Sequence, residues 1–242
     1  MKITTATDMG GRSHQEDGFV IFRGRKGVLL AVMDGHTGDG TAVFVAENLK
    51  RIFAPAIKRF GARRALSVIF NKLNLLTREM ESGSTLSVVW ITKKGARAHI
   101  AILGDSPIIV KTPGHDTWLA PEHNVRTNLK DRGAAVRRGG TYGNGYLFGS
   151  GDKGLQLSRA LGDSELDDVL DRTPEIFSVP IKKGTAIILA SDGVLDPSHE
   201  ESTAHVERLV KMVMSGSGAK DLVEDALRRR TGDNVTAVVC VI

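Results

Sequence analysis

The sequence predicts an α+β protein built as an αββα four-layer sandwich, with two mainly antiparallel β-sheets flanked by helix pairs. Two observations support this: strand-like runs occur in groups, and helical segments arrive in pairs between those groups. Each amphipathic helix pair must bury its apolar face. The simplest arrangement therefore places two sheets face to face in the middle and one helix pair on each outer face. No linker is evident, and we expect residues 1–242 to form a single domain.

Short apolar runs rich in Val and Ile, bounded by glycine, indicate the strands. Three of these runs carry an aspartate at one end: 28–33 before Asp34, 185–190 before Asp192, and 235–242 after Asp233. Four more strands are expected at 18–22, 84–92, 96–103 and 107–112. The last three are expected to form a meander, with a turn at 93–95.

Helices are expected at 38–60, 62–81, 125–132, 198–214 and 219–230. In the first of them Val43, Ala46, Leu49 and Ile52 recur at the three- and four-residue spacing of one helix face. The first two segments and the last two form the expected outer pairs.

The stretch 121–163 is the least regular part of the chain. It contains a glycine-rich passage at 139–146, which supplies flexible or positive-φ backbone but has no Lys-Ser/Thr ending of a phosphate-binding P-loop. We interpret 121–163 as an insert or flap near the site, and a plain loop explains it equally well.

Composition narrows the function classes. The chain has 33 basic and 28 acidic residues, but 5% aromatic residues offer few stacking platforms for nucleic acid, so the composition does not favour nucleic-acid binding. Basic pairs at 50–51, 58–59 and 63–64 are typical of solvated helix faces. No apolar run approaches the roughly 20 residues of a membrane span, and no apolar stretch follows Lys2 as in a secretory signal. We expect a cytoplasmic monomer without membrane contact.

The single cysteine, Cys240, lies in the last predicted strand. A disulfide within the chain is therefore excluded, and we expect a buried, inert thiol. A cysteine-nucleophile phosphatase needs an Arg-containing loop after its Cys, and only Val241 and Ile242 follow here. We therefore expect a mechanism that does not use this thiol.

Acidic residues collect at strand ends. If the strand after Asp233 runs antiparallel to the other two, Asp34, Asp192 and Asp233 meet at one rim of a sheet. Such carboxylates raise each other's pKa values unless a cation neutralises them. Glu16 and Asp17 precede one further strand and Asp105 follows another, which extends the set. Oxygen-only ligands favour Mg²⁺ or Mn²⁺ over zinc, whereas the simpler reading is that each Asp-Gly pair forms a turn.

Seven short motifs then occur in a recognisable order: GRSHQED (11–17), DGH (34–36), GST (83–85), GDS (104–106), SRALGD (158–163), SDG (191–193) and GDNVT (232–236). In these motifs the chain resembles the metal-dependent type 2C (PPM) serine/threonine protein phosphatases. The resemblance spans nearly the whole chain. It implies the αββα sandwich and the hydrolysis of phosphoserine and phosphothreonine in proteins, without a phosphoenzyme.

The resemblance also implies ligands for two core Mg²⁺ or Mn²⁺ ions and for a weaker third ion. The implied ligands are Asp34 bridging two ions, the Gly35 carbonyl on one of them, Asp192 and Asp233 on the other, Glu16 through a bound water, and Asp105 with Asp192 at the third position. Two such ions can share a water and aim it at phosphorus.

Two residues are implied for the chemistry itself. His36 resembles the general acid that protonates the leaving alkoxide, and Arg12 resembles the clamp on the phosphate oxygens. The competing readings are a turn histidine and a salt bridge from Arg12 to Glu16 or Asp17. A second shell of Asp17, Asp196 and Asn234 is expected to orient the ligands. Asp163 is interpreted as structural.

The departures from the family pattern include Pro107 where Arg is common, near the expected third-ion position, and Leu195 where Trp is common before Asp196. Neither removes a metal ligand. An alternative function is a catalytically weak pseudophosphatase that binds phosphoproteins or a protein kinase. A two-metal nuclease is a third candidate, prompted by the net charge of +5.

Overall fold

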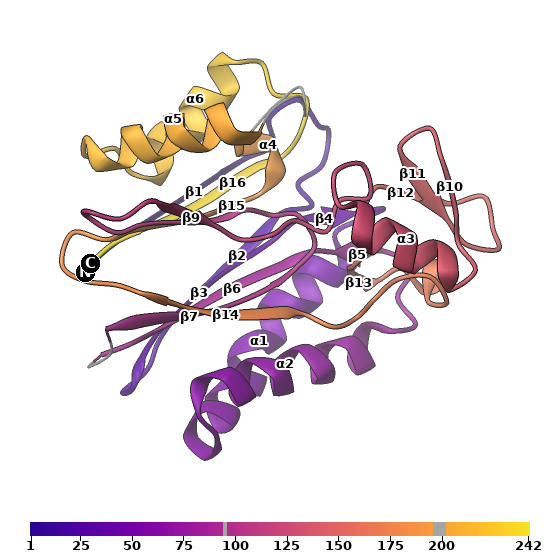
Figure 1. The fold of residues 1–242 in the computed structure, drawn as a ribbon, viewed down its shortest axis with the longest axis horizontal. Helices are drawn as coiled ribbons and strands as arrows, with labels where there is room; N and C mark the ends of the chain where they lie inside the picture. The colour runs from indigo at the N-terminus through magenta and orange to yellow at the C-terminus, as the bar shows by residue number, and fades with distance from the viewer. Residues whose placement is uncertain (94–95, 196–201) are drawn as a thin grey trace.

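The computed structural model describes residues 1–93, 96–195 and 202–242. Two five-stranded sheets face each other, and helices cover both outer faces (Figure 1). All strand pairings in the two sheets are antiparallel. The predicted αββα sandwich is confirmed.

The first sheet contains, in spatial order, β1 (Lys2–Asp8), β16 (Val235–Val241), β15 (Ala186–Ala190), β8 (Ile108–Lys111) and β9 (Thr117–Leu119). The second contains β14 (Glu175–Pro180), β7 (Arg97–Leu103), β6 (Leu86–Thr92), β3 (Gly27–Met33) and β2 (Gly18–Arg23). The β1–β16 pairing runs without interruption from Lys2 opposite Val241 to Asp8 opposite Val235. The strands expected at 84–92, 96–103 and 107–112 are present as β6, β7 and β8, but the prediction that they form one meander was wrong, because β8 pairs with β15 and β9 rather than with β7. Residues 94–95 of the predicted turn lie outside the described residues.

The helices bury one apolar face each. Helices α1 (Gly40–Arg59) and α2 (Ala62–Thr77) pack on the second sheet, and α4 (Asp192–Leu195), α5 (Ser202–Met214) and α6 (Ala219–Arg228) pack on the first. The predicted helix 62–81 stops earlier, at Thr77, and the one-turn helix α4 was not predicted. Residues 198–201 of the fourth predicted helix lie outside the described residues.

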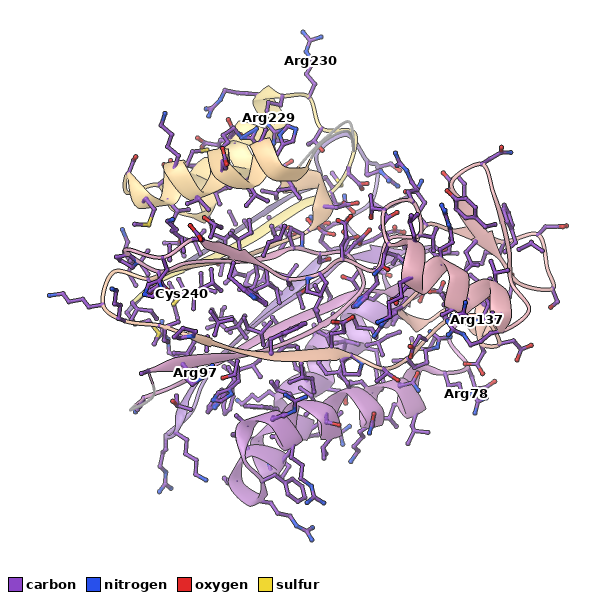
Figure 2. The ribbon with its side chains drawn as sticks, in the orientation of Figure 1. Arg78, Arg97, Arg137, Arg229, Arg230 and Cys240 are labelled. Atoms are coloured by element: carbon purple, nitrogen blue, oxygen red, sulfur yellow. The ribbon has the colours of Figure 1, made fainter. Side chains whose placement is uncertain are left out.

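A third apolar layer fills the space between the sheets, where Leu30, Ile100, Leu189 and Val238 are fully buried. Cys240 belongs to this layer (Figure 2), and burial raises the pKa of its thiol to about 11. The thiol is therefore buried as predicted and protonated at neutral pH. None of the described helices has the length and apolar character that a membrane span requires.

The 121–163 region is more regular than predicted. Its helix α3 (Leu129–Arg137) begins and ends later than the expected 125–132, because the Asn128 side chain accepts the Asp131 N–H at 3.0 Å and fixes the start. The glycine-rich passage forms a hairpin of β10 (Thr141–Gly143) and β11 (Tyr146–Phe148), joined by Asn144 and Gly145, both at positive φ. A third strand, β12 (Gly154–Leu155), completes this small sheet.

A second small sheet joins the sandwich to this region. Its strands are β4 (Gly35–His36), β5 (Gly83–Ser84) and β13 (Leu161–Gly162), and a short 3-10 helix η1 (Ser164–Leu166) follows. Figure 1 shows both small sheets and α3 at one end of the sandwich.

Candidate functional site

Both large sheets deliver aspartates to the same end of the sandwich. Asp34 directly follows β3 of the second sheet, whereas Asp192 follows β15 and Asp233 precedes β16 of the first. The prediction that all three meet at the rim of one sheet was therefore wrong, because β3 pairs with β2 and β6 rather than with β15. They meet instead across the gap between the two sheets.

A cavity of about 480 Å³ opens at this end. The predicted site residues that line it are Arg12, Glu16, Asp34, Gly35, His36, Asp105, Asp192 and Asp233. Asp17 and Asn234 lie behind this wall and contact residues beside it, and Asp196 lies outside the described residues. The structure thus brings together the seven residues that were expected to hold metal or phosphate and His36, the expected general acid.

The carboxylates of this cavity perturb one another. Burial, and then the charge of Asp192, raises the pKa of Asp34 well above its ordinary value. Burial first, and then neighbouring carboxylates, raises the pKa values of Asp105 and Asp192 to about 7. The pKa of Asp17 rises to about 6, again mainly through burial. The protein therefore holds several carboxylates where their negative charges are poorly balanced.

The donor set fits a hard divalent cation. Every acidic donor in the cavity is an oxygen, and a cation would supply the positive charge that the raised pKa values show to be lacking. In the described part of the chain, no three such side chains already form a coordination group. The acids share one cavity without a completed ligand shell.

Close backbone packing holds the acidic residues in place. The Asn234 side chain accepts the Glu16 N–H at 2.9 Å and donates to the carbonyls of Met9 and His14. At Gly35, an added Cβ would lie 2.4 Å from the Glu16 carbonyl oxygen, so no larger residue fits. Asn234 thus ties the loop before β2 to the start of β16.

Arg12 stands at the cavity mouth with its side chain 54% exposed. Its Nη2 donates to Asp233 Oδ2 at 2.8 Å, and its Nε donates to the Gly232 carbonyl at 3.2 Å. The partner is therefore Asp233 and not the Glu16 or Asp17 of the simpler reading. A guanidinium in this position can exchange these contacts for an anion in the cavity.

His36 has a built-in partner. Its Nε2 lies 2.8 Å from Oδ2 of the fully buried Asp163, and Lys153 Nζ donates to Asp163 Oδ1 at 3.0 Å. Burial would raise the pKa of Asp163, but the hydrogen bonds and charges of His36 and Lys153 lower it below its ordinary value. The contact needs Gly83, where an added Cβ would lie 2.1 Å from both His36 Nε2 and Asp163 Oδ2.

Sequence reasoning missed Asp163, the partner of the histidine, and Lys153, which donates to Asp163. Asp163 was assigned only a loop-holding role, although its place after the two-residue strand β13 repeats the pattern of the other strand-end acids. Lys153 gave no signal, because a single lysine in a glycine-rich loop has no distinguishing pattern. The same region lines the cavity with Tyr146 and residues 154–157.

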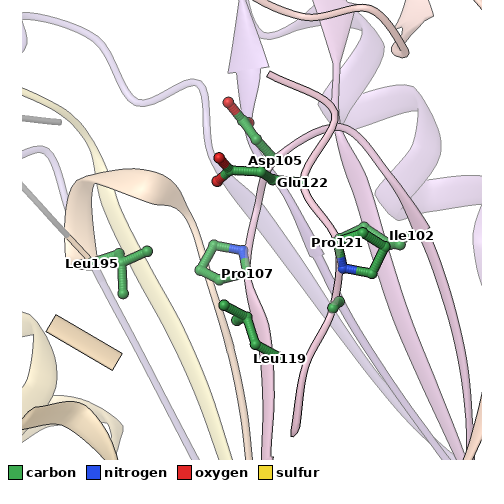
Figure 3. A pocket seen from close by; sticks show the side chains of 8 residues that line it. Ile102, Asp105, Pro107, Leu119, Pro121, Glu122 and Leu195 are labelled. Carbon is green, nitrogen blue, oxygen red and sulfur yellow. The ribbon is translucent and has the colours of Figure 1, made fainter. Parts of the chain in front are cut away.

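A second cavity of about 300 Å³ adjoins the first and shares Asp105 with it (Figure 3). Pro107, Leu119 and Leu195 supply apolar walls, and Glu122 brings a second carboxylate close to Asp105. Pro107 and Leu195 are the two departures noted in the sequence. Both departures therefore lie in the apolar wall of the cavity beside Asp105.

The sequence and the fold are both similar to those of known proteins. The family model for protein phosphatase 2C matches residues 10–235. Probable protein phosphatase 2C 9 of Arabidopsis thaliana is 29% identical over 223 residues, covering 87% of this chain and 76% of the relative. Probable protein phosphatase 2C 59 of Oryza sativa subsp. japonica is 30% identical over 225 residues, covering 87% and 65%. For some of the other relatives the chain spans about half of their length, for example 47% of probable protein phosphatase 2C 3.

Two solved structures share the fold. A Caenorhabditis elegans sex determining protein superposes with a TM-score of 0.81 at 24% identity, covering 98% of this chain and 64% of that one. Serine-threonine phosphatase 2C from Toxoplasma gondii superposes with a TM-score of 0.78 at 23% identity, covering 98% and 93%.

Proposed function

The chain belongs to the protein phosphatase 2C family, and from this premise we propose that it hydrolyses phosphoserine and phosphothreonine in proteins with the help of Mg²⁺ or Mn²⁺. Its relatives and its fold are those of protein serine/threonine phosphatases. One observation carries the proposal: five acidic side chains from both sheets line one cavity, and three of them, Asp34, Asp105 and Asp192, have raised pKa values. A hydrolase that handles a phosphate dianion beside such a cluster requires cations.

We assign the metal-holding role to the acids of the cavity. Asp34, the Gly35 carbonyl, Asp192 and Asp233 would hold two core ions, Glu16 would hold a water beside them, and Asp105 with Asp192 would form a third position. When bound, the ions lower the pKa of water and neutralise charge on the transferred phosphoryl group. The protein contributes a fixed framework, because Asn234 and Gly35 leave the acidic loops little freedom.

Arg12 and His36 act on the substrate in this proposal. The Arg12 guanidinium at the cavity mouth offers paired N–H donors to two phosphate oxygens. Because the Asp163 carboxylate accepts from Nε2 of His36, the imidazolium form gains a buried counter-charge. The proton held at Nδ1 of that form is then the one available to the leaving serine or threonine oxygen, a strong base that benefits from it.

The region 121–163 is proposed to shape substrate choice, since Tyr146 and residues 154–157 line the cavity. Replacing 141–145, the strand β10 and its turn, by a short linker should alter preference among phosphopeptides more than it alters turnover of a small aryl phosphate. Equal effects on both substrates would remove the basis for this role.

The function is tested by hydrolysis of a phosphothreonine peptide with Mn²⁺, with Mg²⁺ and with a chelator, using Asp192→Ala as the matched variant. We expect turnover that requires the metal and is lost in the variant. Folded wild-type protein that binds Mn²⁺ yet shows no turnover would favour the alternative of a phosphoprotein- or kinase-binding module. A His36→Ala variant separates the acid role: it should lose far more activity on the phosphopeptide than on an aryl phosphate, whose leaving group needs no proton.

A further inference from the structure

The end of the sandwich away from the acidic cavity carries an unbalanced positive charge. Residues 23–26, in the β2–β3 turn, and residues 50–64, at the end of α1 and start of α2, contain nine Lys and Arg and no Asp or Glu. Within the described ranges none of these nine makes an ion pair. Positive charges that gather without anionic side chains between them repel one another, so this cluster lowers the stability of the unbound protein.

A groove of about 300 Å³ lies within this basic surface, between the β2–β3 turn and α1. Its floor is apolar, formed by Phe22, Ile57 and Trp90, and its rim carries Arg25, Lys26 and Lys58. The three rim side chains are exposed. The turn is fixed to the helix because Lys26 Nζ donates to the Ile57 and Lys58 carbonyls at 3.4 Å each. The groove is therefore a preformed hollow with an apolar base and a cationic edge.

We propose that this groove docks an acidic segment of a partner protein, seating one apolar side chain on the floor while flanking carboxylates meet the basic rim. Charge complementarity and the hollow shape together favour this occupant. The site is separate from catalysis, because the seven-residue strand β3 places the turn about 20 Å from Asp34. Docking there would leave the acidic cavity open.

Two other polyanions fit the surface less well. Membrane attachment normally needs apolar side chains that insert, and the described residues at 20–26 and 50–64 include no exposed large apolar side chain. Single-stranded nucleic acid needs free aromatic faces, and the Phe60 ring is already covered by Arg64 at 4.7 Å and Arg59 at 5.3 Å.

The test uses a short fluorescein-labelled peptide with one leucine between runs of glutamate, and a matched peptide with glycine in place of leucine. We expect Arg25→Glu with Lys58→Glu to weaken leucine-peptide binding by about tenfold or more. Ala54→Phe, which fills the groove without changing charge, should reduce leucine-peptide binding to the level of the glycine peptide.

The control is Lys220→Glu with Arg228→Glu on α6, where two exposed cations make only intrahelical ion pairs. This variant should bind the peptide as the wild type does. All variants should keep aryl phosphate turnover, which confirms folding and separates docking from catalysis. The proposal is overturned if both charge-reversal variants bind equally, if Ala54→Phe has no effect, or if oligonucleotides or anionic vesicles bind this surface more tightly than the leucine peptide.

Discussion

Among the described residues, the charges around Arg159 and the charges in the acidic cavity are arranged in opposite ways. Around Arg159 the charges balance: its guanidinium donates to both oxygens of Asp131, at 2.7 and 3.1 Å, and also reaches Glu175 at 3.4 Å. Burial alone would raise the pKa of Asp131, but Arg159 lowers it below its ordinary value. In the acidic cavity, the carboxylates of Asp34 and Asp192 have raised pKa values instead.

The difference shows which acids belong to the fold and which await a ligand. A buried carboxylate with a built-in cation is complete as the chain folds. Carboxylates that stand beside other carboxylates, whose charges raise their pKa values, are neutralised only when a cation arrives from solution. Substitutions in each cluster, and removal of metal, can test this difference.

Arg159→Met should destabilise the fold strongly. It removes the cation and leaves Asp131 buried beside no positive charge, which should lower the free energy of unfolding by about 3–5 kcal/mol. Urea denaturation of the chelated protein measures this. If the variant were as stable as the wild type, the balanced cluster would not be a structural element.

Removing metal should make stability fall as pH rises. The carboxyls of Asp105 and Asp192 have pKa values near 7 in the fold against an ordinary 3.8, so between these values the folded chain binds more protons than the unfolded chain. Their stabilising protons are present at low pH and lost as pH rises through about 7. In chelator the melting temperature should therefore fall by about 5 °C or more from pH 5.5 to pH 8.

The same measurement with excess Mn²⁺ serves as its control. Mn²⁺ neutralises the carboxylates that have lost their protons at high pH, so the stabilisation by Mn²⁺ should be greater at pH 8 than at pH 5.5. A melting temperature in chelator that rises over this range would contradict the assigned pKa values.

Asp105→Asn should stabilise the chelated protein, opposite in sign to the Arg159 variant. The amide keeps an oxygen to accept the Asn124 side-chain N–H, which lies 2.9 Å from Asp105 Oδ2, but it carries no charge. We expect a gain of about 1–2 kcal/mol at pH 8 in urea denaturation. A loss of stability instead would show that this carboxylate is already balanced within the fold.

The smallest effect concerns Lys153, the cation that shares Asp163 with His36. Lys153→Met should lower turnover of a phosphothreonine peptide by about tenfold and of an aryl phosphate by about twofold, because the loss acts through the proton donor. Lys153→Arg should restore most of the difference. Equal losses on both substrates would assign Lys153 to packing alone.

The layers of the fold and the acidic residues that line the cavity could be predicted from the sequence. Strand-end aspartates such as Asp34 and Asp233 can be recognised in the sequence because each stands at one end of an apolar run. Which strands share a sheet could not be predicted, because the runs before Asp34 and Asp192 have the same pattern. The start of α3 was missed for a local reason, since Asn128 outweighs the earlier periodic residues by capping the helix. The Lys153 contact depends on a long-range juxtaposition that no spacing encodes.

The uninterrupted pairing of β1 with β16 bears on the order in which the molecule assembles. A nascent chain that emerges from the ribosome with β1 must wait for more than 200 further residues before its partner strand is made. Asp233 arrives in the same late segment, and its carbonyl oxygen packs where a Cβ on Gly10 would sit, at 1.9 Å. Completion of the first sheet and completion of the acidic cavity are thus one late event, so partly synthesised chains expose an open sheet edge and lack an intact site.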